Sequence, residues 1–118
     1  MQSTLEAPIR KRINAYLKRM GAWVYHPHGA GASMAGAPDL LVCYKGRFLG
    51  LEVKRPGGKA TELQAHTLEE ITEAGGVSSV VTSVEEVETI LRRVDSEPTW
   101  GSDDPESFTR RRTSRSDR

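Results

Sequence analysis

Hydrophobic residues recur with a helical spacing at the start of the chain and with a strand spacing in its middle. Over residues 3–20 the apolar positions return every three or four residues, which predicts a helix with one face on a core. That face carries Ile9, Ile13, Leu17 and Met20. Residues 39–44 and 47–54 are apolar runs separated only by Lys45 and Gly46. Two such runs joined by two residues, the second a glycine, predict a β-hairpin.

The other segments complete an α/β pattern. We predict a short strand at 22–26 beside the hairpin, a helix at 62–74, a buried strand at 77–82 and a closing helix from Val84. In the helix at 62–74, Leu63, Leu68 and Ile71 are expected to pack on the sheet. Because a helix separates it from the hairpin, the last strand should run parallel to the second hairpin strand. The predicted order is αβββαβα, with a mixed four-stranded sheet flanked by helices.

Counting outward from the turn sets the register of the hairpin. Leu41 then faces Gly50, and Asp39 faces Glu52. Because side chains alternate along a strand, Lys54 lies on the same face as Glu52. The other face is apolar and should pack on the core; it carries Leu40, Val42, Leu49, Leu51 and Val53.

Two carboxylates that face each other repel and need compensation. A divalent cation such as Mg2+ supplies it, and can orient and deprotonate water for attack on a phosphorus atom. Lys54 would lie beside that water. The alternative is an ordinary solvated ion pair of Lys54 with Glu52 or Asp39, which contributes little. For an isolated Glu-x-Lys triplet that alternative is preferred; the facing Asp39 favours the metal site.

Several motifs at this spacing resemble one nuclease family. They are Gly36-Ala37-Pro38-Asp39, Glu52-Val53-Lys54, Arg55-Pro56-Gly57-Gly58-Lys59 and Gln64. Together they resemble the VRR-Nuc family, the virus-type replication and repair nucleases of the PD-(D/E)XK superfamily, from about residue 6 to residue 91. The resemblance implies a restriction-endonuclease-like α/β core.

The resemblance also implies roles for individual residues. Asp39, Glu52 and the backbone carbonyl of Val53 would be metal ligands, with Mg2+ or Mn2+ as the metal. Lys54 would position or activate water, and Gln64 would match the glutamine that the family carries on the helix after the hairpin. From its spacing alone, Gln64 would be an exposed surface amide.

Glu6 matches the acidic residue on the family's first helix and would be a further metal ligand. Its position also continues the apolar stripe of that helix. Ser3-x-x-Glu6 is equally a capping box, which needs no metal. The spacing does not separate these two interpretations, and the resemblance favours the metal ligand.

Contacts with DNA are predicted from residues around the hairpin. Arg55 and Lys59 flank the proposed site and are expected to contact phosphates. The glycine-rich loop 27–36 enters the site and would let a DNA backbone approach closely. Zinc is not expected, because Cys43 is the only cysteine and the histidines have no zinc-ligand spacing.

Length and composition limit the number of domains and the class of protein. With 118 residues the chain is expected to form one domain, 1–94, with a modest core. Its 17 basic and 16 acidic residues nearly cancel, so the net charge does not indicate whether the chain binds nucleic acid. Cys43 cannot form an internal disulfide and is interpreted as a small core residue. No apolar run is long enough to span a bilayer, so we expect no membrane partner and a cytoplasmic protein, in a bacterial host if a phage encodes it.

From Asp95 the composition changes to polar and charged residues with an arginine cluster at 110–112. We assign 95–118 to a disordered charged tail. Its arginines could add nonspecific affinity for DNA, and no packing pattern favours that role over a solvated extension.

The sequence therefore predicts a metal-dependent DNA endonuclease that hydrolyses phosphodiester bonds. A homodimer acting on branched DNA such as four-way junctions is an extension that rests on the resemblance. The alternative is a non-catalytic DNA-binding or assembly module with the same fold. The set Asp39, Glu52 and Lys54 argues against that module, since the fold requires none of the three. Whether the substrate is DNA or RNA is left open.

Overall fold

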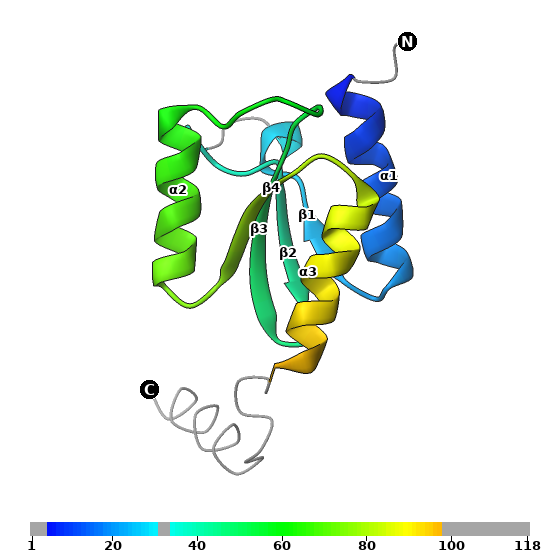
Figure 1. Cartoon of the computed structure of the whole chain (residues 1–118). Helices are drawn as coiled ribbons and strands as arrows, with labels where there is room; N and C mark the ends of the chain where they lie inside the picture. The colour runs from blue at the N-terminus through cyan, green and yellow to red at the C-terminus, as the bar shows by residue number, and fades with distance from the viewer. Residues whose placement is uncertain (1–4, 31–33, 98–118) are drawn as a thin grey trace.

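The computed structural model describes residues 5–30 and 34–97 (Figure 1). The predicted order αβββαβα is confirmed, with a short 3-10 turn added after the first strand. The elements are α1 (Glu6–Arg19), β1 (Trp23–Tyr25), η1 (Pro27–Ala30), β2 (Leu40–Tyr44), β3 (Arg47–Val53), α2 (Glu62–Glu73), β4 (Val77–Val81) and α3 (Val84–Ser96).

The four strands form one sheet in the order β1-β2-β3-β4. β2 pairs antiparallel with both β1 and β3, and β3 pairs parallel with β4, as predicted for a strand reached through a helical crossover. Figure 1 shows α2 on one side of the sheet and α1 and α3 on the other. None of the helices in the described part of the chain is both long and apolar enough to cross a membrane.

The β2–β3 hairpin has the predicted two-residue turn. Lys45 and Gly46 both adopt positive φ, 50° and 83°, as a type I′ turn requires. The register pairs Leu41 with Gly50, as predicted from the turn. The face predicted as core is fully buried against α1 and α3, and comprises Leu40, Val42, Leu49, Leu51 and Val53.

Three apolar residues lie elsewhere than predicted. Cys43 is exposed, not part of the core, because it points to the side of the sheet that carries α2, where α2 packs on β3 and β4. Leu63, predicted to pack on the sheet, is 51% exposed at the start of α2. Met20, predicted on the apolar stripe of α1, follows the helix as its C-cap and is exposed.

The last helix extends past the predicted domain boundary. α3 continues to Ser96, and Asp95 accepts a 2.9 Å hydrogen bond from the Tyr44 hydroxyl. The Asp95 carboxylate is also 3.1 Å from Nζ of Lys45, so the hairpin turn anchors the end of the helix. Residues 98–118, most of the predicted tail, lie outside the described residues.

Gly50 lies where α2 crosses β3, so a substitution at this position tests how closely the helix packs on the strand. A Cβ at this position would be 2.6 Å from Cδ1 of Ile71 and 3.2 Å from Cγ of Pro38. We expect Gly50→Ala to lower the free energy of unfolding by about 1–3 kcal/mol, measured by urea denaturation. Ile71→Val removes the nearer atom, so the alanine should cost less in that background. An equal cost in both backgrounds would show that Ile71 is not the obstacle.

Candidate active site

Asp39 and Glu52 meet at the end of the hairpin that is far from its turn. Asp39 directly precedes β2 and lies one residue beyond the Leu40–Leu51 pair. Its Oδ2 accepts a 2.9 Å hydrogen bond from the backbone N–H of Val53, which follows Glu52 on β3. Glu52 is only 2% exposed. The hairpin therefore holds two carboxylates on neighbouring strands, one of them buried.

The segment Gly36-Ala37-Pro38 positions Asp39. Gly36 has φ +84°, and a Cβ on it would be 2.6 Å from Cγ of Leu63, so only glycine lets the chain pass this close to α2. Nε2 of His28 lies 2.8 Å from the carbonyl oxygen of Ala37, to which it can donate. These contacts tie the start of β2 to both α2 and the loop after β1.

Burial controls the charge of Glu52. Removal from water, and then repulsion by Asp39, raise the pKa of Glu52 from 4.5 to about 7. Nζ of Lys54 lies 3.6 Å from Oε2 of Glu52 and lowers that pKa in part. The other oxygen, Oε1, is buried and has no hydrogen-bond partner among the described residues. A buried carboxylate oxygen of this kind requires an explanation.

These residues fit a divalent cation. A cation between Asp39 and Glu52 would offset their repulsion and give Oε1 of Glu52 a partner. Within the described ranges, no group of three or more His, Cys, Asp or Glu side chains could hold a metal ion. The structure therefore supplies two carboxylates, and any third protein ligand from this pair of strands would be a backbone oxygen such as that of Val53.

Glu6 is the first residue of α1 and is half-buried. It is not gathered with Asp39 and Glu52 into a three-carboxylate group. The N-cap of α1 is Leu5, which makes no side-chain capping bond. Ser3 of the alternative capping box lies outside the described residues. Figure 1 shows the first turn of α1 and the loop after β3 at the same end of the molecule. A role of Glu6 as a metal ligand stays a prediction.

Gln64 has a structural partner that the sequence already signalled. Its Oε1 accepts a 2.9 Å hydrogen bond from the backbone N–H of Thr61, while the Thr61 hydroxyl accepts from the Gln64 N–H at 3.2 Å. This is a complete capping box at the start of α2. The T-x-x-Q spacing is its sequence signature, and the side-chain amide of Gln64 still has its N–H donors for other partners.

The loop from β3 to α2 carries Arg55 and Lys59. A turn closed by a 2.8 Å hydrogen bond from Gly58 N–H to Arg55 O reverses the chain, and Gly57 has the positive φ, 86°, that such a turn needs. Both basic side chains belong to exposed residues, and neither forms a salt bridge within the described part of the chain. The predicted turn is confirmed, and it leaves two exposed basic residues on the loop that follows Glu52 and Lys54.

Two solved structures share this fold. A protein described as "VRR_NUC domain" aligns with a TM-score of 0.61 and 28% identity over 74% of this chain and 94% of its own. This likeness supports the resemblance of the chain to the VRR-Nuc family. A second structure, described as "VRR_NUC domain protein", aligns with a TM-score of 0.63 and 20% identity over 79% of this chain and 89% of its own, which supports the fold. No family model matches the sequence, and no curated protein matches it.

The VRR-Nuc fold explains why the carboxylates lie at one end of the sheet. VRR-Nuc is a nuclease-fold domain, and nuclease domains of the PD-(D/E)XK type generally use divalent metals. In this chain the antiparallel hairpin brings Asp39 to Glu52. The parallel strand β4 holds Lys54 in place, because the Lys54 N–H donates a 3.0 Å hydrogen bond to the carbonyl oxygen of Val81. The site thus lies at the ends of strands: Glu52 is in β3, Asp39 directly precedes β2 and Lys54 directly follows β3.

The raised pKa of Glu52 predicts how the stability of this VRR-Nuc domain depends on pH without metal. A carboxyl whose pKa is higher in the folded state stabilises the fold fully below its unfolded value of 4.5, and this contribution is lost as pH rises through about 7. Glu52→Gln stays neutral throughout. In the presence of chelator, the Tm of the variant minus the Tm of wild type should therefore increase by at least about 5 °C from pH 5.5 to pH 8.5. A constant difference would show that Glu52 ionises normally.

Proposed function

We propose that this VRR-Nuc domain is a Mg2+- or Mn2+-dependent endonuclease that hydrolyses phosphodiester bonds in DNA. One observation carries the proposal. The buried Oε1 of Glu52 has no hydrogen-bond partner in the part of the chain that the structure describes, and it lies next to Asp39 and to the ammonium group of Lys54. Repelling carboxylates beside a lysine at the end of a sheet are costly for a purely structural role. They are suited to binding a cation at a phosphodiester.

The protein groups have separate roles in this proposal. Asp39, Glu52 and the Val53 carbonyl would hold the cation, with Glu6 as a further ligand or as part of a second cation site. When bound, a divalent cation supplies Lewis-acid activation of the phosphodiester and lowers the pKa of water. The ammonium group of Lys54, which is largely shielded from solvent, would orient water and stabilise negative charge at the phosphorus.

The remaining groups would bind the substrate. Arg55 and Lys59 are free to contact phosphates on either side of the cleaved bond, because charged contacts of this kind position DNA without reading its sequence. We propose that the chain acts in the cytoplasm, and that it acts on branched DNA such as four-way junctions as a homodimer. A dimer would present two sites, which suits symmetric cuts in two strands.

The test is cleavage of labelled four-way junction, flap, single-stranded and linear duplex DNA, with a single-stranded RNA in parallel, in Mg2+ or Mn2+. We expect wild type to cut DNA, chelator to abolish cutting, and Lys54→Ala to cut at least about 100-fold more slowly. The ranking of substrates tests the preference for junctions. DNA binding without any cleavage in either metal would overturn the nuclease and support the non-catalytic module.

Gln64 allows its catalytic and capping roles to be separated. We expect Gln64→Ala to lower the free energy of unfolding by about 1 kcal/mol through loss of the capping box. Gln64→Glu can still accept from the Thr61 N–H and should keep the stability of wild type. If Gln64 also acts in cleavage, Gln64→Glu will be stable but at least about tenfold slower in DNA cleavage. Full activity in Gln64→Glu would leave Gln64 with a capping role alone.

A further inference from the structure

His28 lies beside the segment that carries Asp39, although it belongs to a different element. It is the second residue of η1, and its Nε2 lies 2.8 Å from the carbonyl oxygen of Ala37. A carbonyl oxygen can only accept, so Nε2 carries the proton of this hydrogen bond. Ala37 precedes Asp39 by two residues and is only 6% exposed. A buried carbonyl requires a hydrogen-bond partner, and the ring of His28 supplies one.

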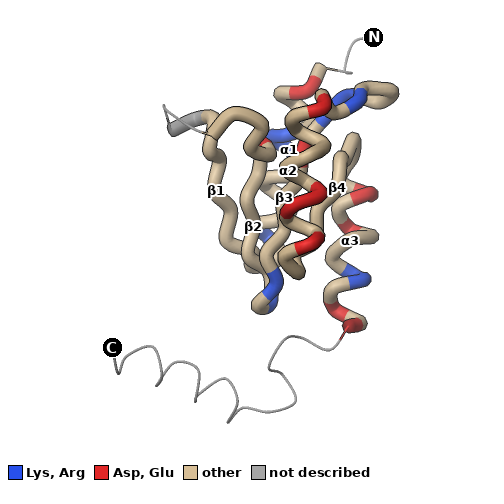
Figure 2. The backbone as a smooth tube through the Cα atoms, turned by 90° about the vertical axis from the view of Figure 1, so that its left-hand side faces the viewer, with Lys and Arg blue, Asp and Glu red and all other residues tan. Residues whose placement is uncertain are grey.

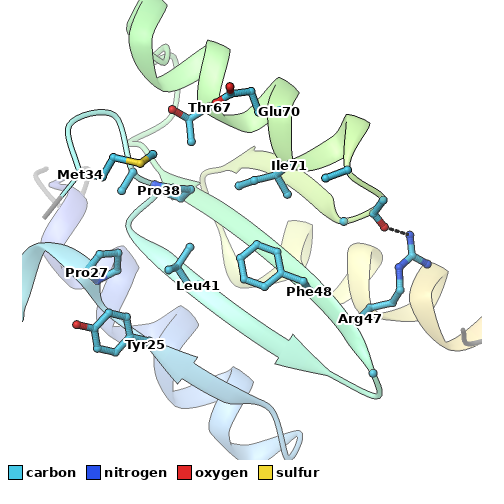
Figure 3. A pocket seen from close by; sticks show the side chains of 15 residues that line it. Tyr25, Pro27, Met34, Pro38, Leu41, Arg47, Phe48, Thr67, Glu70 and Ile71 are labelled. Atoms are coloured by element: carbon cyan, nitrogen blue, oxygen red, sulfur yellow. Dashed lines mark hydrogen bonds between the residues drawn. The ribbon is translucent and has the colours of Figure 1, made fainter. Parts of the chain in front are cut away.

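The register of β1 and β2 explains why these two segments meet. Tyr25 pairs with Leu41, so two further steps along this antiparallel pair bring Pro27 level with Asp39. Figure 3 shows Pro27 past the end of β1, at the end of the sheet where β2 begins. Pro27 has no N–H and cannot extend the ladder of backbone hydrogen bonds. The side chain of His28 therefore provides a donor where the backbone at Pro27 cannot.

Pro38 connects the bonded residue rigidly to the carboxylate. It follows Ala37 and precedes Asp39, its ring restricts φ, and the residue is buried. A Cβ on Gly50 would be 3.2 Å from Cγ of Pro38, so the ring packs closely on β3, the strand that carries Glu52. A displacement of Ala37 would therefore be passed on to Asp39 rather than absorbed between them.

Two further contacts hold the same segment from other elements. Oδ2 of Asp39 accepts a 2.9 Å hydrogen bond from the Val53 N–H at the end of β3. At Gly36 the chain passes so close to α2 that a Cβ would be 2.6 Å from Cγ of Leu63. The bond of His28 adds a contact from η1. Contacts from several elements are what keep a ligand within the narrow range of positions that a metal site requires.

The contact with His28 leaves the charge of Asp39 intact. β1 and η1 contain no Lys, Arg, Asp or Glu, and Figure 2 shows β1 without charged residues. A cationic side chain at this place would pair with the carboxylate and compete with a metal ion for it. The bond of His28 goes to a backbone carbonyl instead, so the carboxylate stays available as a ligand. Groups that do not touch a metal commonly orient its ligands.

We propose that His28 is a positioning residue for Asp39 and thereby for the cation. Its hydrogen bond to Ala37 fixes the backbone from which the Asp39 carboxylate meets Glu52 and the metal. His28 acts through that backbone and not as a ligand. The inference rests on the cation site of the proposed function and deepens it by naming a residue on which the geometry of that site depends.

Mn2+ affinity in the absence of DNA tests the proposal. Free Mn2+ is measured by its electron paramagnetic resonance signal while the full chain is titrated into it. We expect His28→Ala to weaken Mn2+ binding at least about tenfold, as is usual when the partner that orients a metal ligand is removed. His28→Gln keeps a side-chain N–H donor and should bind Mn2+ within about threefold of wild type.

His26→Ala is the matched control. Nε2 of His26 lies 3.1 Å from Oδ1 of Asn14 on α1, so this variant loses a histidine hydrogen bond outside the segment 36–39 and should keep the Mn2+ affinity of wild type. Circular dichroism confirms that each variant is folded. Equal Mn2+ affinity in His28→Ala and wild type would overturn the proposal, even if the Tm of the variant is lower. So would an equal loss in His26→Ala or in His28→Gln.

The outcomes distinguish this inference from the proposed nuclease. If wild type binds Mn2+ and His28→Ala binds it equally well, only the role of His28 is lost. If His28→Ala binds Mn2+ more weakly but wild type cleaves no DNA, His28 still positions the ligand and the nuclease is removed. Absence of Mn2+ binding by wild type would overturn the cation site, and both proposals with it.

Discussion

Glu52→Gln is expected to lower the rate of metal-dependent DNA cleavage by about 10³-fold, one of the two largest effects expected of a single substitution in this chain. Gln has the shape of Glu but no charge, so it removes a cation ligand without creating a cavity. The metal-free fold should keep its stability or gain some, because the buried charge that Asp39 repels is gone. The measurement is single-turnover cleavage of the preferred DNA substrate at saturating metal.

A thermal-shift experiment separates loss of the cation from loss of chemistry. Mg2+ or Mn2+ should raise the Tm of wild type, because a ligand that binds only the folded state stabilises it, and should not raise that of Glu52→Gln. Glu73→Gln, at the exposed end of α2, is the control that removes a carboxylate away from the site. If Glu52→Gln cleaves DNA at the wild-type rate, Glu52 is not a ligand and the site is misassigned.

Asp39→Asn should have a similar effect on cleavage, about 10³-fold, for a related reason. The amide oxygen of Asn can still accept the hydrogen bond from the Val53 N–H, which Asp39 accepts at 2.9 Å. The start of β2 should therefore stay in place while the charge is lost. Removing that charge also removes one cause of the raised Glu52 pKa, which should fall toward its ordinary value.

The comparison with Asp39→Ala distinguishes a structural role from a catalytic one. Alanine leaves the Val53 N–H without its acceptor and should lower the free energy of unfolding by about 1–3 kcal/mol, measured in urea, whereas Asn should change it little. Both variants should lose cleavage. If Asn restores both stability and cleavage, the carboxylate of Asp39 holds the strand and not a cation.

Local patterns along the chain were sufficient to predict most of the architecture. A two-residue turn with glycine second admits essentially one hairpin register, so counting from Lys45 and Gly46 predicted that Leu41 pairs with Gly50. Alternation along the strands then predicted the buried face. The parallel pairing of β4 followed from the helix before it. Each of these depends on neighbours in sequence, which is why no long-range information was needed.

Other features depend on how distant elements pack. The sequence does not specify how much of the sheet α2 covers, so Cys43 was predicted in the core and is exposed. The same packing leaves Leu63 in solvent. The capping box of Gln64 is different, since T-x-x-Q is visible in the sequence and the interaction could have been predicted from it.

The amino-acid sequence alone established the order of elements, the hairpin that brings Asp39 and Glu52 to neighbouring strands, and the motifs of the VRR-Nuc family. These follow from periodicity and turn chemistry, which act over a few residues. Tertiary packing established the burial of Glu52 and the rise of its pKa to about 7. Burial depends on which helix covers which strand, and that is settled by contacts between residues far apart in the chain.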